Sequence, residues 1–80
     1  MLEEKTIMLK IPSGEIIKFY AKDSTKIVEL KEKLFNILQI PVQQQLLIFK
    51  GKRLDDQSTL SQNNITNGTV VNQCRILIGD

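Results

Sequence analysis

Histidine is missing from the 80-residue chain, and cysteine occurs only once, at Cys74. Without histidine the chain cannot form a Ser-His-Asp triad or a Cys-His pair, and one cysteine cannot furnish a zinc site or an internal disulfide. The four glycines form no phosphate-binding loop, and the adjacent acids Asp55 and Asp56 lie in a polar segment typical of a solvated surface. We therefore expect no enzyme activity, no metal, no cofactor and no small-molecule substrate.

Long apolar runs are missing as well. Glu3, Glu4 and Lys5 interrupt the start of the chain, and no apolar segment approaches the ~20 residues of a membrane helix. We expect no secretion signal and no membrane association, which together with the single cysteine favours a cytoplasmic and/or nuclear protein. The 11 basic and 9 acidic residues are mixed along the chain and leave a net charge of +2, so we expect no nucleic-acid binding.

Two stretches near the start alternate between apolar and polar residues, as half-buried strands do. They cover residues 6–11 and 15–21, and the turn sequence Pro12-Ser13-Gly14 separates them, which predicts a β-hairpin. Met8, Ile16 and Tyr20 fall on its outward side. We interpret these three as a cross-strand cluster rather than as a second binding patch.

The period changes to that of a helix after residue 21. The apolar stripe consists of Ile27, Leu30, Leu34 and Leu38, with Ile37 beside it. Asp23, Ser24 and Thr25 are candidates for the N-terminal cap. The helix should end before Ile40, because the residue that precedes a proline, here Pro41, is disfavoured in helical conformation.

The stretch 46–49 is apolar on both faces of a predicted strand. By the two-residue period, Leu47 and Phe49 point one way and Leu46 and Ile48 the other. A turn at Gly51 and a short edge segment over residues 52–54 follow. One face belongs to the core. The other is either covered by the chain's own tail or offered to a partner, and we favour the partner.

The final strand, over residues 70–78, cannot keep one face apolar in an unbroken register. Either Asn72 or Gln73 would then point inward. We expect a bulge or small loop at these two residues. The bulge would turn Val71, Cys74, Ile76 and Ile78 inward and leave Arg75 and Leu77 outside. On this interpretation Cys74 is a buried small hydrophobic residue rather than a reactive thiol.

The predicted order is therefore strand, strand, helix, strand, short edge strand and final strand, in one domain over residues 1–80, ordered from about 5 to 79. A sheet covered on one face by a single helix follows, which is an α+β architecture. We expect a monomer.

A series of landmarks at compatible spacings resembles the ubiquitin-like family. They are Ile40-Pro41, Gln44-Gln45, Leu47-Ile48-Phe49, Gly51-Lys52, Leu54, Thr59-Leu60-Ser61, Asn64-Ile65 and Gly68-Thr69-Val70. The resemblance implies the β-grasp fold, with a mixed sheet, from about Lys5 to Gly79. The strings 47–52 and 74–79 are further similar to the ubiquitin-like segment of BAG-family co-chaperones. That similarity implies a chaperone regulator of which this chain is the N-terminal part.

The resemblance also implies a protein-binding surface on the sheet. Its three places fall at Pro12, at Ile48 and at either Cys74 or Leu77, depending on the bulge. Leu46 and Ile76 stand where ubiquitin carries arginines, and Lys52 stands at the family's commonest chain-linking lysine. Lys52 and Arg53 together are either a solvated turn or a pair that steers an acidic-rimmed partner. The candidate binding residues are Pro12, Leu46, Ile48, Gly51, Lys52 and Leu77.

The partners that the resemblance implies are proteins with ubiquitin-binding elements, including proteasome receptors. Three departures bear on this. Gln39 stands where ubiquitin has a glycine, Pro12 replaces a leucine and so contributes a smaller apolar surface, and Leu77-Ile78-Gly79-Asp80 lacks a diglycine. A docking module is therefore favoured over a conjugated modifier, whose diglycine would have to lie beyond residue 80. A sulfur-carrier protein would need the same extension.

Overall fold

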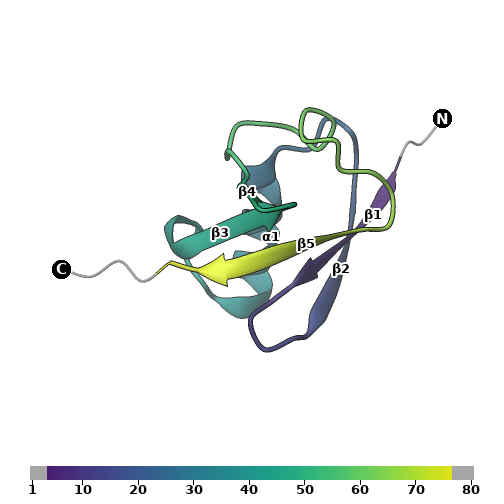
Figure 1. Cartoon of the computed structure of the whole chain (residues 1–80). Helices are drawn as coiled ribbons and strands as arrows, with labels where there is room; N and C mark the ends of the chain where they lie inside the picture. Colours follow the sequence, from purple (N-terminus) through teal and green to yellow (C-terminus); the bar gives the residue numbers. More distant parts are fainter. Residues whose placement is uncertain (1–3, 77–80) are drawn as a thin grey trace.

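The computed structural model describes residues 4–76 and has the predicted order of elements (Figure 1). A hairpin of two strands opens the chain, one α-helix follows, and three further strands complete the sheet. A short 3-10 helix before the third strand is the one element that the sequence did not predict. The elements are β1 (Lys5–Lys10), β2 (Ile16–Ala21), α1 (Ile27–Leu38), η1 (Val42–Gln44), β3 (Gln45–Phe49), β4 (Lys52–Arg53) and β5 (Thr69–Arg75).

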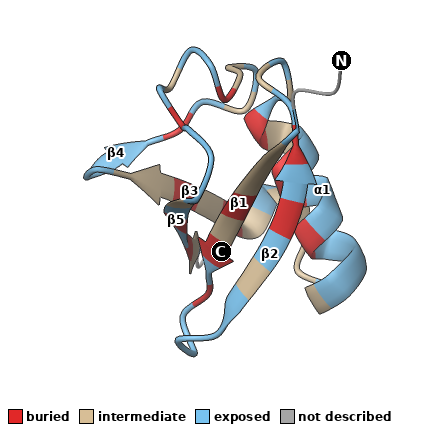
Figure 2. Ribbon diagram, turned by 90° about the vertical axis from the view of Figure 1, so that its right-hand side faces the viewer, coloured by how far each residue is buried: buried red, intermediate tan, exposed pale blue. Residues whose placement is uncertain are grey.

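The five strands form one mixed sheet in the order β2-β1-β5-β3-β4. β1 and β5 run parallel in its centre, and the other neighbouring pairs are antiparallel. α1 lies against one face of this sheet and leaves the opposite face uncovered (Figures 1 and 2). We call the covered side the inner face and the uncovered side the outer face.

The core lies between the inner face and α1, where Figure 2 shows buried residues as red bands. Alternate strand residues supply one half of it and the apolar stripe of the helix supplies the other half, as the sequence pattern predicts. The fully enclosed apolar side chains are Ile7, Leu9, Ile27, Leu30, Leu34, Leu47, Leu60, Ile65 and Val71.

The N-terminus of α1 differs from the prediction. Lys26 is the cap residue, in an extended conformation, and its N–H donates to the Glu29 carboxylate at 3.0 Å. The first helical N–H groups donate to the carbonyls of Ser58 and Asp56, at 2.9 and 3.0 Å. Because these loop carbonyls already satisfy them, no cap side chain from residues 23–25 is needed.

The buried stripe of α1 also differs from the prediction at two positions. Ile37 is 53% exposed, whereas Lys31 is buried. The ammonium of Lys31 lies 2.6 Å from a carboxylate oxygen of Asp56, so a buried aliphatic stem ends in a paired charge. The sequence pattern missed this because it scores lysine as a surface residue.

The predicted bulge in the last strand is wrong. β5 runs without interruption, and Cys74 and Gln73 lie opposite Leu46 and Leu47 of β3. The register therefore directs Gln73 inward, where it is 2% exposed and neither polar atom of its side chain has a hydrogen-bond partner. Cys74 is half-buried and on the outer face rather than in the core. β5 keeps its backbone hydrogen bonds to β3 without interruption, and the side-chain amide of Gln73 is buried as a consequence.

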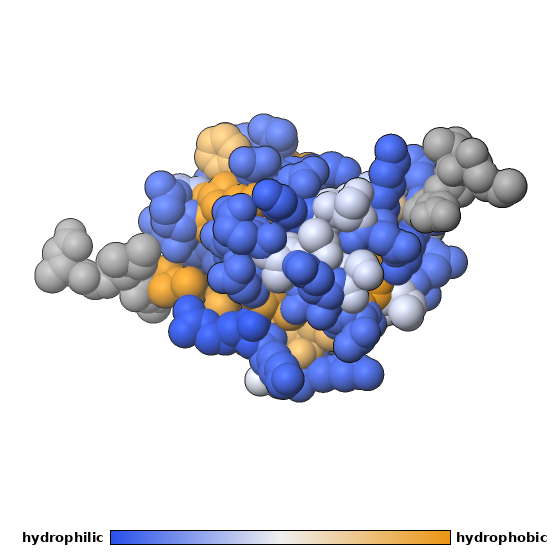
Figure 3. All heavy atoms as spheres, turned by 90° about the horizontal axis from the view of Figure 1, so that it is seen from above, coloured by the Kyte–Doolittle hydropathy of each residue, from blue (hydrophilic) through white to orange (hydrophobic). Residues whose placement is uncertain are grey.

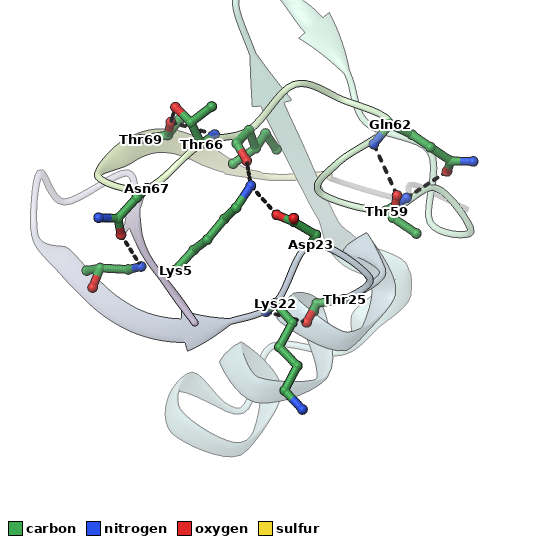
Figure 4. A network of polar contacts seen from close by, with 11 residues as sticks. Lys5, Lys22, Asp23, Thr25, Thr59, Gln62, Thr66, Asn67 and Thr69 are labelled. Carbon is green, nitrogen blue, oxygen red and sulfur yellow. Dashed lines mark hydrogen bonds and ion pairs between the residues drawn. The ribbon is translucent and has the colours of Figure 1, made fainter. Parts of the chain in front are cut away.

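A polar network holds the long connection between β4 and β5 (Figure 4). Lys5 donates to the Ile65 carbonyl at 3.0 Å and forms an ion pair with Asp23. Thr59 and Gln62 bond each other's backbone N–H groups at 2.9 and 3.1 Å. The connection is thereby tied to the start of β1. Within residues 4–76, no helix is both long and apolar enough to cross a membrane.

Candidate protein-docking surface

The orientation of β3 is set by Gln45, its first residue. Gln45 is 1% exposed, and its side-chain N–H₂ group donates to the carbonyls of Lys31 and Ile40, at 2.8 and 2.9 Å. The amide thus joins the strand to α1 and to the segment that follows the helix. With Gln45 fixed inward, strand alternation directs Leu47 into the core and Leu46 and Ile48 outward.

Leu46 and Ile48 lie on the outer face and are partly exposed. Leu46 faces Cys74 of β5, and Ile48 faces Asn72 on one side and Arg53 of β4 on the other. No part of the chain between residues 4 and 76 buries them fully. Their outward orientation is as the sequence predicts, and their binding role stays a prediction.

Pro12 is exposed in the turn after β1. Lys10, the last residue of β1, lies opposite Asn72 of the parallel strand β5. Beyond that pair, the chain toward Pro12 runs in the same direction as β5 toward Cys74. We call Pro12, Leu46, Ile48 and Cys74 the β3 surface. The predicted alternative to Cys74, Leu77, lies outside the described residues.

Gly51 and Lys50 make the tight turn between β3 and β4. Both have positive φ, 78° and 53°, as a two-residue hairpin loop of this kind requires. A β-carbon on Gly51 would meet nothing within 4 Å, so the backbone angle rather than crowding favours glycine there. Its role is to set the register of β4.

The basic pair after this turn divides between the two faces. Arg53 lies opposite Ile48 and so belongs to the outer face, whereas Lys52 lies opposite Phe49 and belongs to the other side. Lys52 is exposed beside a hollow that Phe49, Lys50 and Gln62 help to line. The charge that adjoins the β3 surface is therefore Arg53, and a binding role for Lys52 stays a prediction.

A second hollow, of about 480 Å³, borders the β3 surface at Leu46. Val42 and Ile76 add apolar atoms to it, and Arg53, Asp55 and Asp56 surround them with charges of both signs. This hollow could not be predicted from the sequence, because η1, which carries Val42, has no periodic pattern of its own. Seen from above, apolar side chains reach the surface as separate areas among hydrophilic ones (Figure 3).

The outer face also carries an apolar group away from β3, made of Met8, Ile16, Tyr20 and Val70. Three of them were predicted to point outward as a cluster. Val70 is added by the unbroken register of β5. Among the described residues, no three or more cysteine, aspartate and glutamate side chains are gathered closely enough to hold a metal ion.

Comparisons with known proteins agree with this geometry. The model of the ubiquitin family matches residues 7–76. The NEDD8-like protein RUB1 of Saccharomyces cerevisiae is 34% identical over 62 residues, which cover 78% of this chain and 80% of that protein. The solved UBL domain of Dsk2 from Plasmodium falciparum is similar with a TM-score of 0.84 and 25% identity, over 90% of this chain and 97% of that one. The chain belongs to the ubiquitin family and has its β-grasp fold.

Proposed function

We propose that this chain is a non-catalytic module that docks proteins with ubiquitin-binding elements through the β3 surface. The observation that carries the proposal is the outward, partly exposed position of Leu46 and Ile48 on a strand that lies inside the sheet. Apolar side chains on a rigid strand lose little conformational freedom on binding, which makes them suitable anchors for a partner.

The partner element that fits best is an amphipathic helix. The β3 surface is small and lies on one face of a rigid sheet, so an apolar stripe of a helix can cover it, with Arg53 at its border. A surface of this size supports weak to moderate affinity. Gly51 acts by setting the β3–β4 turn. Leu77 completes the proposed set of binding residues on this surface, and Lys52, on the other side of β4, is proposed as a contact at its edge.

One of the similar solved structures supports a docking module in a larger protein. The solved chain from Plasmodium falciparum is described as the UBL domain of Dsk2, that is, as one domain of a protein. From the resemblance of the sequence to the ubiquitin-like family we propose proteasome receptors as partners, and we propose a cytoplasmic or nuclear location. The strings shared with BAG-family co-chaperones make a co-chaperone the proposed parent protein.

The test compares two alanine variants in binding to a ubiquitin-binding helix from a proteasome receptor. Ile48→Ala should weaken binding at least about tenfold, because it removes a central anchor. Ile37→Ala is the matched control, since Ile37 is exposed on the helix and away from the sheet. Amide spectra of both variants verify the fold. Equal binding by Ile48→Ala and the unchanged protein would remove the proposal.

A second candidate function is a conjugated modifier, favoured by the identity with the NEDD8-like protein. Conjugation of this kind needs a terminal diglycine. The coding sequence beyond residue 80 decides between the two: a diglycine shortly downstream supports the modifier, and a long continuing chain supports the docking module.

A further inference from the structure

Four apolar side chains form a group on the outer face of the first hairpin and its neighbour β5. In the strand register, Met8 lies between Lys18 of β2 and Val70 of β5. Ile16 lies one row away, opposite Lys10, and Tyr20 one row away in the other direction, opposite Thr6. Side chains in adjacent rows of one face are within reach of each other. We call Met8, Ile16, Tyr20 and Val70 the hairpin surface.

Three of the four residues of the hairpin surface are more exposed than Leu46 and Ile48 of the β3 surface. Ile16 is 54% exposed, Tyr20 59% and Val70 41%, whereas Leu46 and Ile48 are only partly exposed. Among residues 4–76, large apolar side chains with comparable exposure lie elsewhere only at Phe35 and Ile37 of α1. The outer face thus concentrates its accessible apolar area on β2, β1 and β5.

Two polar residues separate the hairpin surface from the β3 surface. One row of the sheet reads Ile16, Lys10, Asn72 and Ile48 from β2 across to β3. Three strand spacings lie between the ends of this row, which corresponds to about 14 Å. One helix stripe centred on Ile48 therefore does not also cover Ile16. The two surfaces approach each other only at Val70, which lies diagonally opposite Ile48 between β5 and β3.

The charges at the outward positions of the strands are of one sign. The outward positions of the five strands carry Lys10, Lys18 and Arg53, and within the described part of the chain none of these positions carries a carboxylate. Lys10 and Lys18 both border the apolar group, and both are exposed. A partner that buries this area gains by placing carboxylates beside them.

We propose that the hairpin surface is a second docking site, and that its occupant is an acidic amphipathic helix of another protein. Leucine-like side chains would cover Met8 and Val70, and glutamates or aspartates would face Lys10 and Lys18. A second copy of this chain would instead bring four lysines together, which is unfavourable. Strand addition at β2 is hindered, because the Tyr20 carbonyl of this edge strand already accepts a hydrogen bond from Lys33 Nζ at 3.0 Å.

The probe for this site is a synthetic helical peptide with leucine at every third or fourth position and glutamate on the flanks. Amide signals of the isotope-labelled chain are followed while the peptide is added. The expected result is saturable movement of the signals of Ile16, Lys18, Tyr20 and Val70. A peptide of the same pattern with lysine for every glutamate should move them at least about tenfold more weakly.

Two variants locate the site, with a matched control. Ile16→Thr and Lys18→Glu should each weaken binding of the acidic peptide about tenfold. Threonine keeps the strand preference of Ile16, and the charge change is on an exposed residue. The control is Ile37→Thr, because Ile37 has nearly the same exposure, 53%, on α1. Leu46→Ala should leave this binding unchanged, because Leu46 lies opposite Cys74 and two rows from Val70, and this variant separates the second site from the proposed function.

Several outcomes would overturn the second site. They are signal movement confined to Leu46 and Ile48, an equal response to the lysine peptide, the absence of saturable movement, and movement that follows the concentration of the chain itself. The last result would indicate self-association. Stronger binding to anionic vesicles than to the peptide would point to a membrane surface and would also overturn it.

Discussion

The two faces of the sheet use the same strands for different purposes. Along β3, Leu47 is fully buried on the inner face, while Leu46 and Ile48 beside it are partly exposed on the outer face. Along β1 the same holds for Leu9 and Met8. The inner face holds the core, and on the proposed function the outer face is where partners dock, so residues adjacent in sequence should differ in how strongly their mutation affects stability and binding.

The largest effect is expected from truncation on the inner face. Leu47→Ala should lower the free energy of unfolding by about 2–5 kcal/mol, because it leaves a cavity between β3 and α1. Ile48→Ala should lower it by less than about 1.5 kcal/mol, because the side chain is partly exposed. Urea unfolding of both variants measures the difference. Equal losses would show that Ile48 is a core residue and would break the comparison.

Replacing the buried amide of Gln73 should change the free energy of unfolding in the opposite direction. Gln73→Leu should raise the free energy of unfolding by about 1–3 kcal/mol, because it removes two polar atoms that lie on the inner face without a partner. Binding on the outer face should not change. Asn72→Leu is the control, since it alters the neighbouring outward position. A loss of stability in Gln73→Leu would indicate that the amide is hydrogen-bonded in solution.

A smaller gain is expected at the end of the helix that covers the inner face. Gln39 has a left-handed conformation, with φ of 60°. This conformation agrees with the glycine that ubiquitin has at the same position. Gln39→Gly should therefore raise the free energy of unfolding by about 1 kcal/mol. Thermal unfolding measures it, with Asn36→Gly inside the helix as a control that should destabilise. A variant less stable than the unchanged chain would mean that the Gln39 side chain contributes more than the strain costs.

The smallest expected effect is the dependence of acidic-peptide binding on ionic strength. Raising the ionic strength from about 0.05 to 0.5 M should weaken acidic-peptide binding at the hairpin surface several-fold, because exposed charges are screened. The same change should leave the docking of an uncharged apolar peptide nearly unaffected. Fluorescence titration at several salt concentrations tests this. Identical salt dependence of the two peptides would mean that Lys10 and Lys18 do not take part.

The sequence predicted most of this fold because its periods are local. Alternation identified both hairpin strands and the two faces of β3, and the spacing of Ile27, Leu30 and Leu34 identified α1. The resemblance to the ubiquitin-like family predicted the β3 surface, and the structure directs Leu46 and Ile48 outward as that prediction requires.

The errors all came from contacts between distant segments. A polar residue at an inward position suggested a bulge at Gln73, but pairing with β3 kept β5 regular. The caps expected at residues 23–25 were replaced by carbonyls of the loop around Ser58, and Lys31 is buried because Asp56 pairs with it. Neither the loop around Ser58 nor Asp56 can be identified as a partner of the helix from the local spacing of residues. The division of the outer face by Lys10 and Asn72 likewise depends on the register of three strands.

The most direct test of the docking account is to map amide signals of the labelled chain during titration with a ubiquitin-binding helix. The account predicts that the largest movements occur at Leu46, Ile48 and Cys74 on the outer face, with Phe35 and Ile37 of α1 nearly unchanged. Movements concentrated at Phe35 and Ile37, with β3 unaffected, would contradict it.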